Sequence, residues 1–248
     1  MYKKTFLILS CFFLINCESS SYDLVIKNGQ VFDGSGTESK TVDIAITGNT
    51  IIKVGKINSE KSTRVIDASG LIVSPGFIDT HAHLDPMDNL IKLSDSESHV
   101  RQGVTTSFGG PDGRGVPLKY GFKQYLDTIE KVGVGMNMGF LTGHNKIRRV
   151  VMNLDNREPT NDELEIMKNL ASKAMDEGAF GISTGLKYLP GNFSKVDEVI
   201  AISKEISSKG GIYTSHLRDE GLKIIDAVKE AILISKNADI NVVLTHHK

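Results

Sequence analysis

The chain has 248 residues, of which 40% are hydrophobic and 24% are charged. These fractions are typical of folded globular proteins and exclude disordered and collagen-like chains. The formal net charge is -1, from 29 Lys and Arg against 30 Asp and Glu, so there is no excess of positive charge to hold phosphates. Nucleic acid is therefore not expected as a partner.

Residues 1–17 have the pattern of a secretory leader. Lys3 and Lys4 precede an apolar run from Phe6 to Ile15. This run is too short to cross a bilayer as a helix, for which about 20 apolar residues are needed. We expect the segment to direct export across the inner membrane of a bacterium.

The end of the leader, Leu14 to Cys17, resembles the cleavage box of bacterial lipoproteins, in which the cysteine becomes the lipidated N-terminus. Asn16 departs from the small residue that is usual there, and an ordinary signal peptide is the alternative. The only other cysteine, Cys11, lies inside the segment to be removed, so no thiol would remain for a disulfide or a metal. We expect a periplasmic protein, or one attached to the membrane through a lipid on Cys17.

Residues 18–70 are predicted to form a partial β-sandwich. Apolar and polar residues alternate in short runs that turn residues interrupt, which predicts antiparallel β structure. The expected strands are Asp23–Lys27, Val42–Ile46, Ile51–Gly55 and Arg64–Asp67. These are too few for a well-covered sandwich, so its remaining strands should come from elsewhere.

After Gly70 the pattern changes to strands followed by helices, which is typical of parallel βαβ units. The six candidate strands are Phe77–His81, Val104–Phe108, Met136–Leu141, Phe180–Ser183, Ile212–Ser215 and Val242–Thr245. A TIM-type (β/α)8 barrel closes with eight strands and takes about 250 residues by itself. The predicted fold class is α/β, with residues 71–248 forming the N-terminal part of such a barrel, incomplete here.

Two segments between these strands have helical periodicity. The residues that share a face are Phe122, Tyr125, Leu126 and Ile129 in the first, and Leu164, Met167, Leu170, Ala171 and Ala174 in the second. Thr160 with Glu163 forms a capping-box sequence before the second helix, and Ser194 with Asp197 forms a weaker one further along.

Four histidines follow candidate strands of the barrel. His81 and His83 lie at the end of the first strand, where alternate residues share a face and can point at one metal ion. His216 and His246 follow two later strands. Because barrel enzymes place their chemistry at the carboxyl ends of the strands, the set predicts a metal site. For any single histidine, a structural role is the alternative.

Several longer motifs resemble those of a known family. The segment Gly76–His83 resembles the opening motif of the amidohydrolase superfamily. Within it, the segments that closely resemble motifs of the N-acyl-D-amino-acid deacylases, or D-aminoacylases, are Gly181–Gly191, Tyr213–Gly221 and Thr245–Lys248, together with Leu141–Asn145 and Arg148. The resemblance covers nearly everything after the leader, and the end of the chain inside the last motif indicates a truncated reading frame.

The resemblance implies that His216 and His246 bind one tightly held zinc ion, while His81 and His83 frame a second, weaker metal position. In many relatives a cysteine thiolate stands at the position of Asp112. A carboxylate can also bind zinc. The surrounding Pro-Asp-Gly sequence is equally a strong turn signal that needs no metal, and both interpretations stay open.

The activity implied is zinc-dependent hydrolysis of the amide bond of N-acyl-D-amino acids. Tyr188 and Lys248 match positions that bind the substrate carboxylate, to which a phenol and an ammonium can both donate. The family's proton-transfer aspartate follows the eighth strand, beyond Lys248, so the fragment as given is expected to be inactive. His144, after the third candidate strand, is a candidate to polarise the substrate carbonyl, and an orienting or packing role is equally open.

Two other functions remain as alternatives. A related amidohydrolase would act on a cyclic amide or a dipeptide, since metal residues alone do not select the substrate. A metal-free barrel would serve as a binding or assembly protein. Tyr188 and Lys248 favour an acylated amino acid, and the four histidines argue against a metal-free barrel.

Overall fold

The computed structural model describes residues 22–84, 90, 92–116 and 121–246. The expected leader, with Cys17, and the expected substrate-binding Lys248 lie outside these residues. Within the described residues, none of the helices combines the length and the apolar character needed to cross a membrane.

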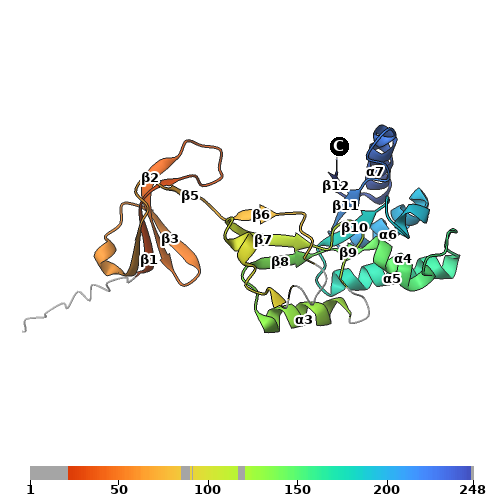
Figure 1. Ribbon diagram of the computed structural model, residues 1–248, viewed down its shortest axis with the longest axis horizontal. Coiled ribbons are helices and arrows are strands. Elements are labelled where there is room, and N and C mark those ends of the chain that lie inside the picture. The colour runs from red at the N-terminus through yellow and green to blue at the C-terminus, as the bar shows by residue number, and fades with distance from the viewer. Residues whose placement is uncertain (1–21, 85–89, 91, 117–120, 247–248) are drawn as a thin grey trace, which may run out of the picture. The chain divides into compact units, whose positions relative to one another are not determined.

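The chain divides into two compact units, Met1–Pro75 and Gly76–Lys248. The sequence pattern predicted a boundary after Gly70, five residues before the one that the structure has. Each unit has its own sheet structure (Figure 1). Each unit also has its own cluster of buried side chains.

The first unit is a mainly antiparallel sheet with strand order β3-β2-β1-β4, and β5 also pairs with β1. Its elements are β1 (Tyr22–Val31), β2 (Lys40–Thr47), β3 (Thr50–Gly55), the 3-10 helix η1 (Ser59–Lys61), β4 (Ser62–Asp67) and β5 (Ile72–Val73). β1 pairs antiparallel with β2, as does β2 with β3. The antiparallel prediction is wrong for β4, which pairs parallel with β1. β5, a strand that the sequence did not predict, also pairs parallel with β1. Residues 56–61 return the chain across the sheet before β4 begins, so β4 runs in the direction of β1.

The sheet of the first unit buries few side chains. Val25, Ala45 and Ile57 form its small core. Ile51 and Ile72 are 59% and 67% exposed, although both are large and apolar. The sheet therefore covers only part of its apolar surface within this unit.

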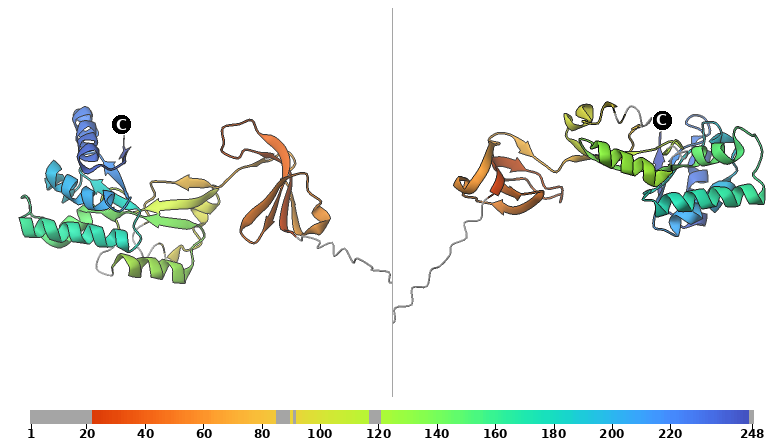
Figure 2. Two further views of the ribbon diagram at one scale, coloured as in Figure 1. Left: turned by 180° about the vertical axis from the view of Figure 1, so that it is seen from behind. Right: turned by 90° about the horizontal axis from the view of Figure 1, so that it is seen from below.

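The second unit is built on parallel strands that follow one another in chain order (Figure 2). They are β6 (Phe77–Asp79), β7 (Val104–Gly109), β8 (Asn137–Phe140), β9 (Thr142–Gly143), β10 (Gly181–Gly185), β11 (Ile212–His216) and β12 (Val242–Thr245). β6, β7 and β8 form one sheet, and β9 to β12 form another. β8 and β9 are successive parts of one path, interrupted at Leu141. Since Phe180 N donates to Phe140 O at 2.9 Å, the pairing continues across the break. The predicted α/β class is confirmed by this arrangement.

Helices connect these strands. They are α2 (Glu97–Val100), α3 (Phe122–Val132), α4 (His144–Met152), α5 (Asn161–Asp176), the 3-10 helix η3 (Gly191–Phe193), α6 (Val196–Ser207) and α7 (Ile224–Ala238). α5 packs against α4 and α6, and α6 packs against α7. The two predicted helical faces are buried, with Phe122, Tyr125 and Ile129 in α3 and Met167, Ala171 and Ala174 in α5. Such burial contributes about 1.5–3 kcal/mol for each large apolar side chain.

Of the two predicted capping boxes, one is present. Thr160 caps α5: its hydroxyl accepts from Glu163 N, and the Glu163 carboxylate accepts from Thr160 N at 2.8 Å. The second prediction is wrong, because the N-cap of α6 is Lys195 and has no side-chain cap. The Ser194 hydroxyl donates instead to the carbonyl of Gly191 in the preceding 3-10 turn, at 2.6 Å.

Candidate metal centre

The structure brings the four histidines together at the carboxyl ends of three strands. His81 and His83 follow β6, His216 ends β11, and His246 follows β12. Ring centroids of His81 and His83 are 5.7 Å apart, those of His81 and His246 are 5.1 Å apart, and those of His216 and His246 are 4.1 Å apart. Because parallel strands end on the same edge, residues separated by more than a hundred positions come into one cluster.

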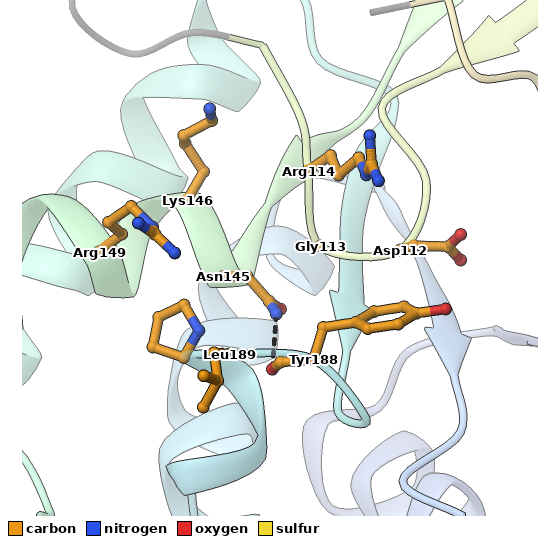
Figure 3. Close-up of a pocket in the computed structure, with 9 residues that line it drawn as sticks. Asp112, Gly113, Arg114, Asn145, Lys146, Arg149, Tyr188 and Leu189 are labelled. Atoms are coloured by element: carbon orange, nitrogen blue, oxygen red, sulfur yellow. Dashed lines mark hydrogen bonds between the residues drawn. The ribbon is translucent and has the colours of Figure 1, made fainter. Parts of the chain in front are cut away.

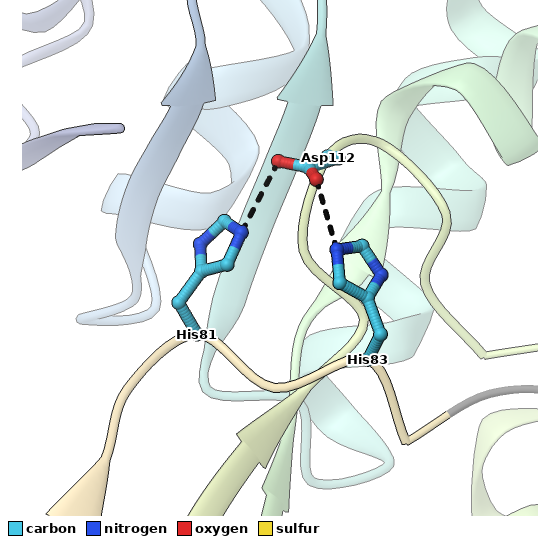
Figure 4. A group of neighbouring side chains, drawn as sticks. All are labelled: His81, His83 and Asp112. Carbon is cyan, nitrogen blue, oxygen red and sulfur yellow. Dashed lines mark ion pairs between the residues drawn. The ribbon is translucent and has the colours of Figure 1, made fainter. Parts of the chain in front are cut away.

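Asp112 lies in the middle of this cluster and is 7% exposed. Its Oδ1 is 3.5 Å from His81 Nε2, 3.3 Å from His216 Nδ1 and 3.4 Å from His246 Nε2. Its Oδ2 is 3.1 Å from His83 Nε2. Figure 4 shows the carboxylate between His81 and His83, with one oxygen turned toward each ring. A single carboxylate therefore contacts all four imidazoles.

The turn that carries Asp112 is held by a neighbouring strand. Ser183 of β10 accepts a hydrogen bond from Gly113 N at 3.0 Å and donates one to Gly110 O at 2.6 Å. Asp112 itself has a left-handed backbone, with φ of 56°. At Gly113 a Cβ atom would lie 2.0 Å from the Asn145 side chain, so a larger residue would displace the turn. The Pro-Asp-Gly turn that the sequence indicated thus exists, and it places the carboxylate among the histidines.

The donor atoms of the cluster fit a metal ion. Within the cluster, five buried atoms have no hydrogen-bond partner among the described residues: His81 Nε2, Asp112 Oδ1, both ring nitrogens of His216, and His246 Nε2. Ligand atoms about 2.0–2.2 Å from one tetrahedral zinc ion would lie about 3.3–3.6 Å from one another. Within the group of Asp112, His216 and His246, the separations of 3.3 Å and 3.4 Å from Asp112 Oδ1 to the two histidine nitrogens match that spacing.

Two groups in the described part of the chain could each hold a metal ion, and they share Asp112. One consists of His81, His83 and Asp112, and the other of Asp112, His216 and His246. Burial lowers the pKa of His216, and the nearby Asp112 carboxylate opposes this shift only in part. The neutral imidazole that results is the form that binds metals.

Tyr188 belongs to the same region. It follows β10, is 47% exposed, and its ring centroid lies 4.5 Å from that of His216. It also lines a cavity of about 460 Å³ whose other walls include Asp112 and the cationic side chains of Arg114 and Lys146. In Figure 3 the phenol oxygen and the Asp112 carboxylate lie on the same side of the cavity. Tyr188 can therefore reach a group that is held near the histidines.

His144 has a different environment. It is the first residue of α4 and is 0% exposed. Its Nε2 lies 2.8 Å from Glu198 Oε1 of α6, and the same carboxylate pairs with Arg148. Burial and a carboxylate partner outside the histidine cluster favour the packing role over contact with a substrate.

Sequence reasoning did not identify Glu220. Its Oε1 lies 3.2 Å from His216 Nε2. Glu220 belongs to the sequence motif around His216. It lies four residues after the end of β11, and this spacing alone does not predict a contact with His216. The proximity depends on a turn that brings the chain back to β11.

Known protein families and sequences match this chain. A sequence model of the amidohydrolase family matches residues 64–224. The chain is 34% identical over 251 residues to a D-aminoacylase from Alcaligenes xylosoxydans xylosoxydans, a match that covers 93% of this chain and 51% of that protein.

Solved structures of related proteins also match this chain. A D-aminoacylase with a binuclear metal center superimposes with a TM-score of 0.85 at 32% identity, covering 92% of this chain and 52% of that one. N-acyl-D-glutamate deacylase from Bordetella bronchiseptica, complexed with zinc and a phosphonate inhibitor, gives a TM-score of 0.85 at 28% identity with the same coverage. The predicted TIM-type barrel fold is confirmed. The chain spans about half the length of the relatives it matches. By sequence match and by fold, the chain belongs to the amidohydrolase family.

Proposed function

We propose that this protein hydrolyses the amide bond of N-acyl-D-amino acids and releases a carboxylate and a D-amino acid. The observation that carries the proposal is the cluster of four histidines around Asp112, with its unpartnered buried donor atoms. The relatives described above are a D-aminoacylase and an N-acyl-D-glutamate deacylase, which share this substrate class. Because the matches cover half of those proteins, the activity is proposed for the whole protein.

The metal that we propose for this site is zinc. His216 and His246 with Asp112 would hold the tightly bound ion, and His81 and His83 with Asp112 would hold a second, weaker one. When bound, zinc lowers the pKa of coordinated water to about 7 and polarises a carbonyl, which suits amide hydrolysis near neutral pH. The carboxylate of Asp112 is a harder ligand than a thiolate, so cobalt or manganese should replace zinc more readily here than at a thiolate site.

We propose that Tyr188 binds the substrate, and the sequence resemblance supports the same role for Lys248, which lies outside the described residues. The Tyr188 phenol can donate a hydrogen bond to the carboxylate of the N-acyl amino acid. Its ring contacts His216, so a carboxylate bound there would leave the neighbouring amide close to the histidine cluster. This arrangement supports a substrate with a free carboxylate next to the scissile amide.

The test is a substrate panel with the whole purified protein. The panel contains N-acetyl-D-amino acids with several side chains, their L-enantiomers, a cyclic amide and a dipeptide. We expect turnover of D-substrates that is lost with dipicolinate and restored by zinc. If the protein hydrolyses only the cyclic amide or only the dipeptide, the proposed substrate class is wrong and that compound represents the true one. Binding of ligands without any turnover would support the metal-free alternative.

A pair of histidine variants gives the matched control. His246→Asn removes a proposed zinc ligand and should abolish zinc-dependent turnover. His99→Asn changes a histidine on the exposed helix α2 and should leave turnover unchanged. Equal loss in both variants would show that the effect is not specific to the cluster.

We also propose that residues 1–17 direct export and that Cys17 carries a lipid, on the pattern of the leader alone. Intact mass of the membrane-bound protein should show the lipid, and Cys17→Ser should release the protein from the membrane. An unmodified mature N-terminus would leave an ordinary signal peptide as the explanation.

A further inference from the structure

His216 has a carboxylate next to each of its two ring nitrogens. Nδ1 lies 3.3 Å from Asp112 Oδ1, on the side of the other histidines, and Nε2 lies 3.2 Å from Glu220 Oε1. The side chain is 2% exposed, so water has little access to either nitrogen. A neutral imidazole carries its proton on one nitrogen only. The two carboxylates therefore compete for that proton.

The turn after β11 holds Glu220 in this position. Asp219 Oδ1 accepts hydrogen bonds from Gly221 N at 2.9 Å and Lys223 N at 3.0 Å, which fold the chain back toward the strand. The Glu220 side chain is only 15% exposed, and its Oε2 lies 3.8 Å from the ammonium of Lys187. These contacts leave Oε1 3.2 Å from His216 Nε2, which is an ion-pair contact and not a hydrogen bond in this structure.

We propose that Glu220 is a positioning residue that keeps the His216 proton on Nε2 and thereby leaves the lone pair of Nδ1 facing Asp112 and the metal position. A carboxylate beside one imidazole nitrogen favours the tautomer that is protonated there, and such partners orient metal-binding histidines. The inference rests on the metal centre of the proposed function, but it does not depend on the identity of the substrate.

Lys187 connects Glu220 with the segment that carries Tyr188, the proposed substrate-binding residue. It directly precedes Tyr188, whose ring contacts His216. The Lys187 side chain is 44% exposed, so its ion pair with Glu220 is weakly stabilising by itself. Its role is to hold the second carboxylate oxygen, which restricts rotation of the Glu220 carboxylate.

The first measurement uses the metal-free protein. Two-bond proton–nitrogen correlation spectra of histidine-labelled protein report which ring nitrogen carries the proton. We expect the Nε2–H tautomer for His216 in the wild type and a mixture of tautomers in Glu220→Leu. Glu220→Gln retains a neutral acceptor oxygen and should preserve most of the wild-type tautomer. His216→Asn identifies the signal.

The second measurement is zinc affinity by competition with a chromophoric chelator. Glu220→Leu should bind zinc about 10- to 100-fold more weakly than the wild type, the usual effect of losing such a partner. Glu220→Gln should fall between the two. The matched control is Glu230→Gln, which breaks the ion pair of Glu230 with Arg218 next to the same turn and should leave zinc affinity unchanged.

The outcomes separate the two proposals. An Nδ1–H tautomer in the wild type, or zinc affinity within twofold of wild type in both Glu220 variants, would overturn the positioning role and leave the metal centre intact. A wild-type protein that binds no zinc would overturn both. Failure to hydrolyse N-acyl-D-amino acids, with the expected tautomer and affinities, would overturn only the proposed substrate.

Discussion

Glu198→Gln should strongly destabilise the second unit, because the Glu198 carboxylate contacts two buried side chains, Arg148 and His144. Its side chain is 2% exposed, and those of Arg148 and His144 are 0% exposed. The variant keeps an acceptor oxygen for one partner but leaves the Arg148 charge without a compensating carboxylate.

The expected loss follows from the burial of these groups. Removing one partner of a buried ion pair costs about 3–5 kcal/mol, because the other charge remains in a medium of low polarity. Arg148 keeps part of its hydrogen bonding, since it also donates to the carbonyls of Asp155 and Arg157. We therefore expect about 3 kcal/mol for Glu198→Gln, at the lower end of that range.

The assay is urea unfolding followed by circular dichroism, since the chain contains no tryptophan. The control is Glu97→Gln, which breaks an exposed ion pair with Arg101 and should cost less than about 1 kcal/mol. A loss below about 1 kcal/mol for Glu198→Gln would refute the reasoning. The double variant Glu198→Leu with Arg148→Met should recover stability relative to Glu198→Leu, because it removes the unpaired charge.

Low pH should also destabilise the fold, through protonation of Glu198. Burial alone would raise the pKa of Glu198, but His144 and Arg148 more than offset this effect and hold the pKa below its ordinary value of 4.5. A carboxyl group whose pKa is lower in the folded state stabilises the fold above its unfolded pKa. This contribution is lost as the pH falls below 4.5 and through the folded pKa, so the wild type should lose more stability there than Glu198→Gln.

Three further outcomes follow from the site and the fold. Asp112→Ala should weaken zinc binding at least about 10-fold in a chelator competition, and unchanged affinity would mean that Asp112 serves only the turn. Tyr188→Phe should raise KM with little change in kcat or zinc content, whereas a fall in kcat alone would assign the phenol to the chemical step. Thr160→Ala should lower the free energy of unfolding by about 1 kcal/mol through loss of the cap on α5, and a change near zero would show that Glu163 alone sustains that helix end.

Much of the local structure follows from the sequence alone. The barrel strands, the buried faces of α3 and α5 and the Thr160 cap depend on periodicity and on residues close in sequence. The approach of the four histidines is also predictable, because each follows a parallel strand and such strand ends share one edge. Residue types and local order were sufficient for these features.

Other features depend on contacts between segments that are distant in sequence. β4 is parallel to β1 because of the path of residues 56–61, and Ser194 bonds back to η3 instead of capping α6.

At the site, the tertiary structure places the Asp112 carboxylate at the centre of the histidines through a clamp by Ser183 of β10. It brings Glu220 back to His216, and it buries His144 against Glu198 of α6. The sequence identified the metal-binding residue types, but a hydrogen bond or an ion pair depends on distances of a few ångströms between remote segments. Only the packing of strands and helices sets those distances.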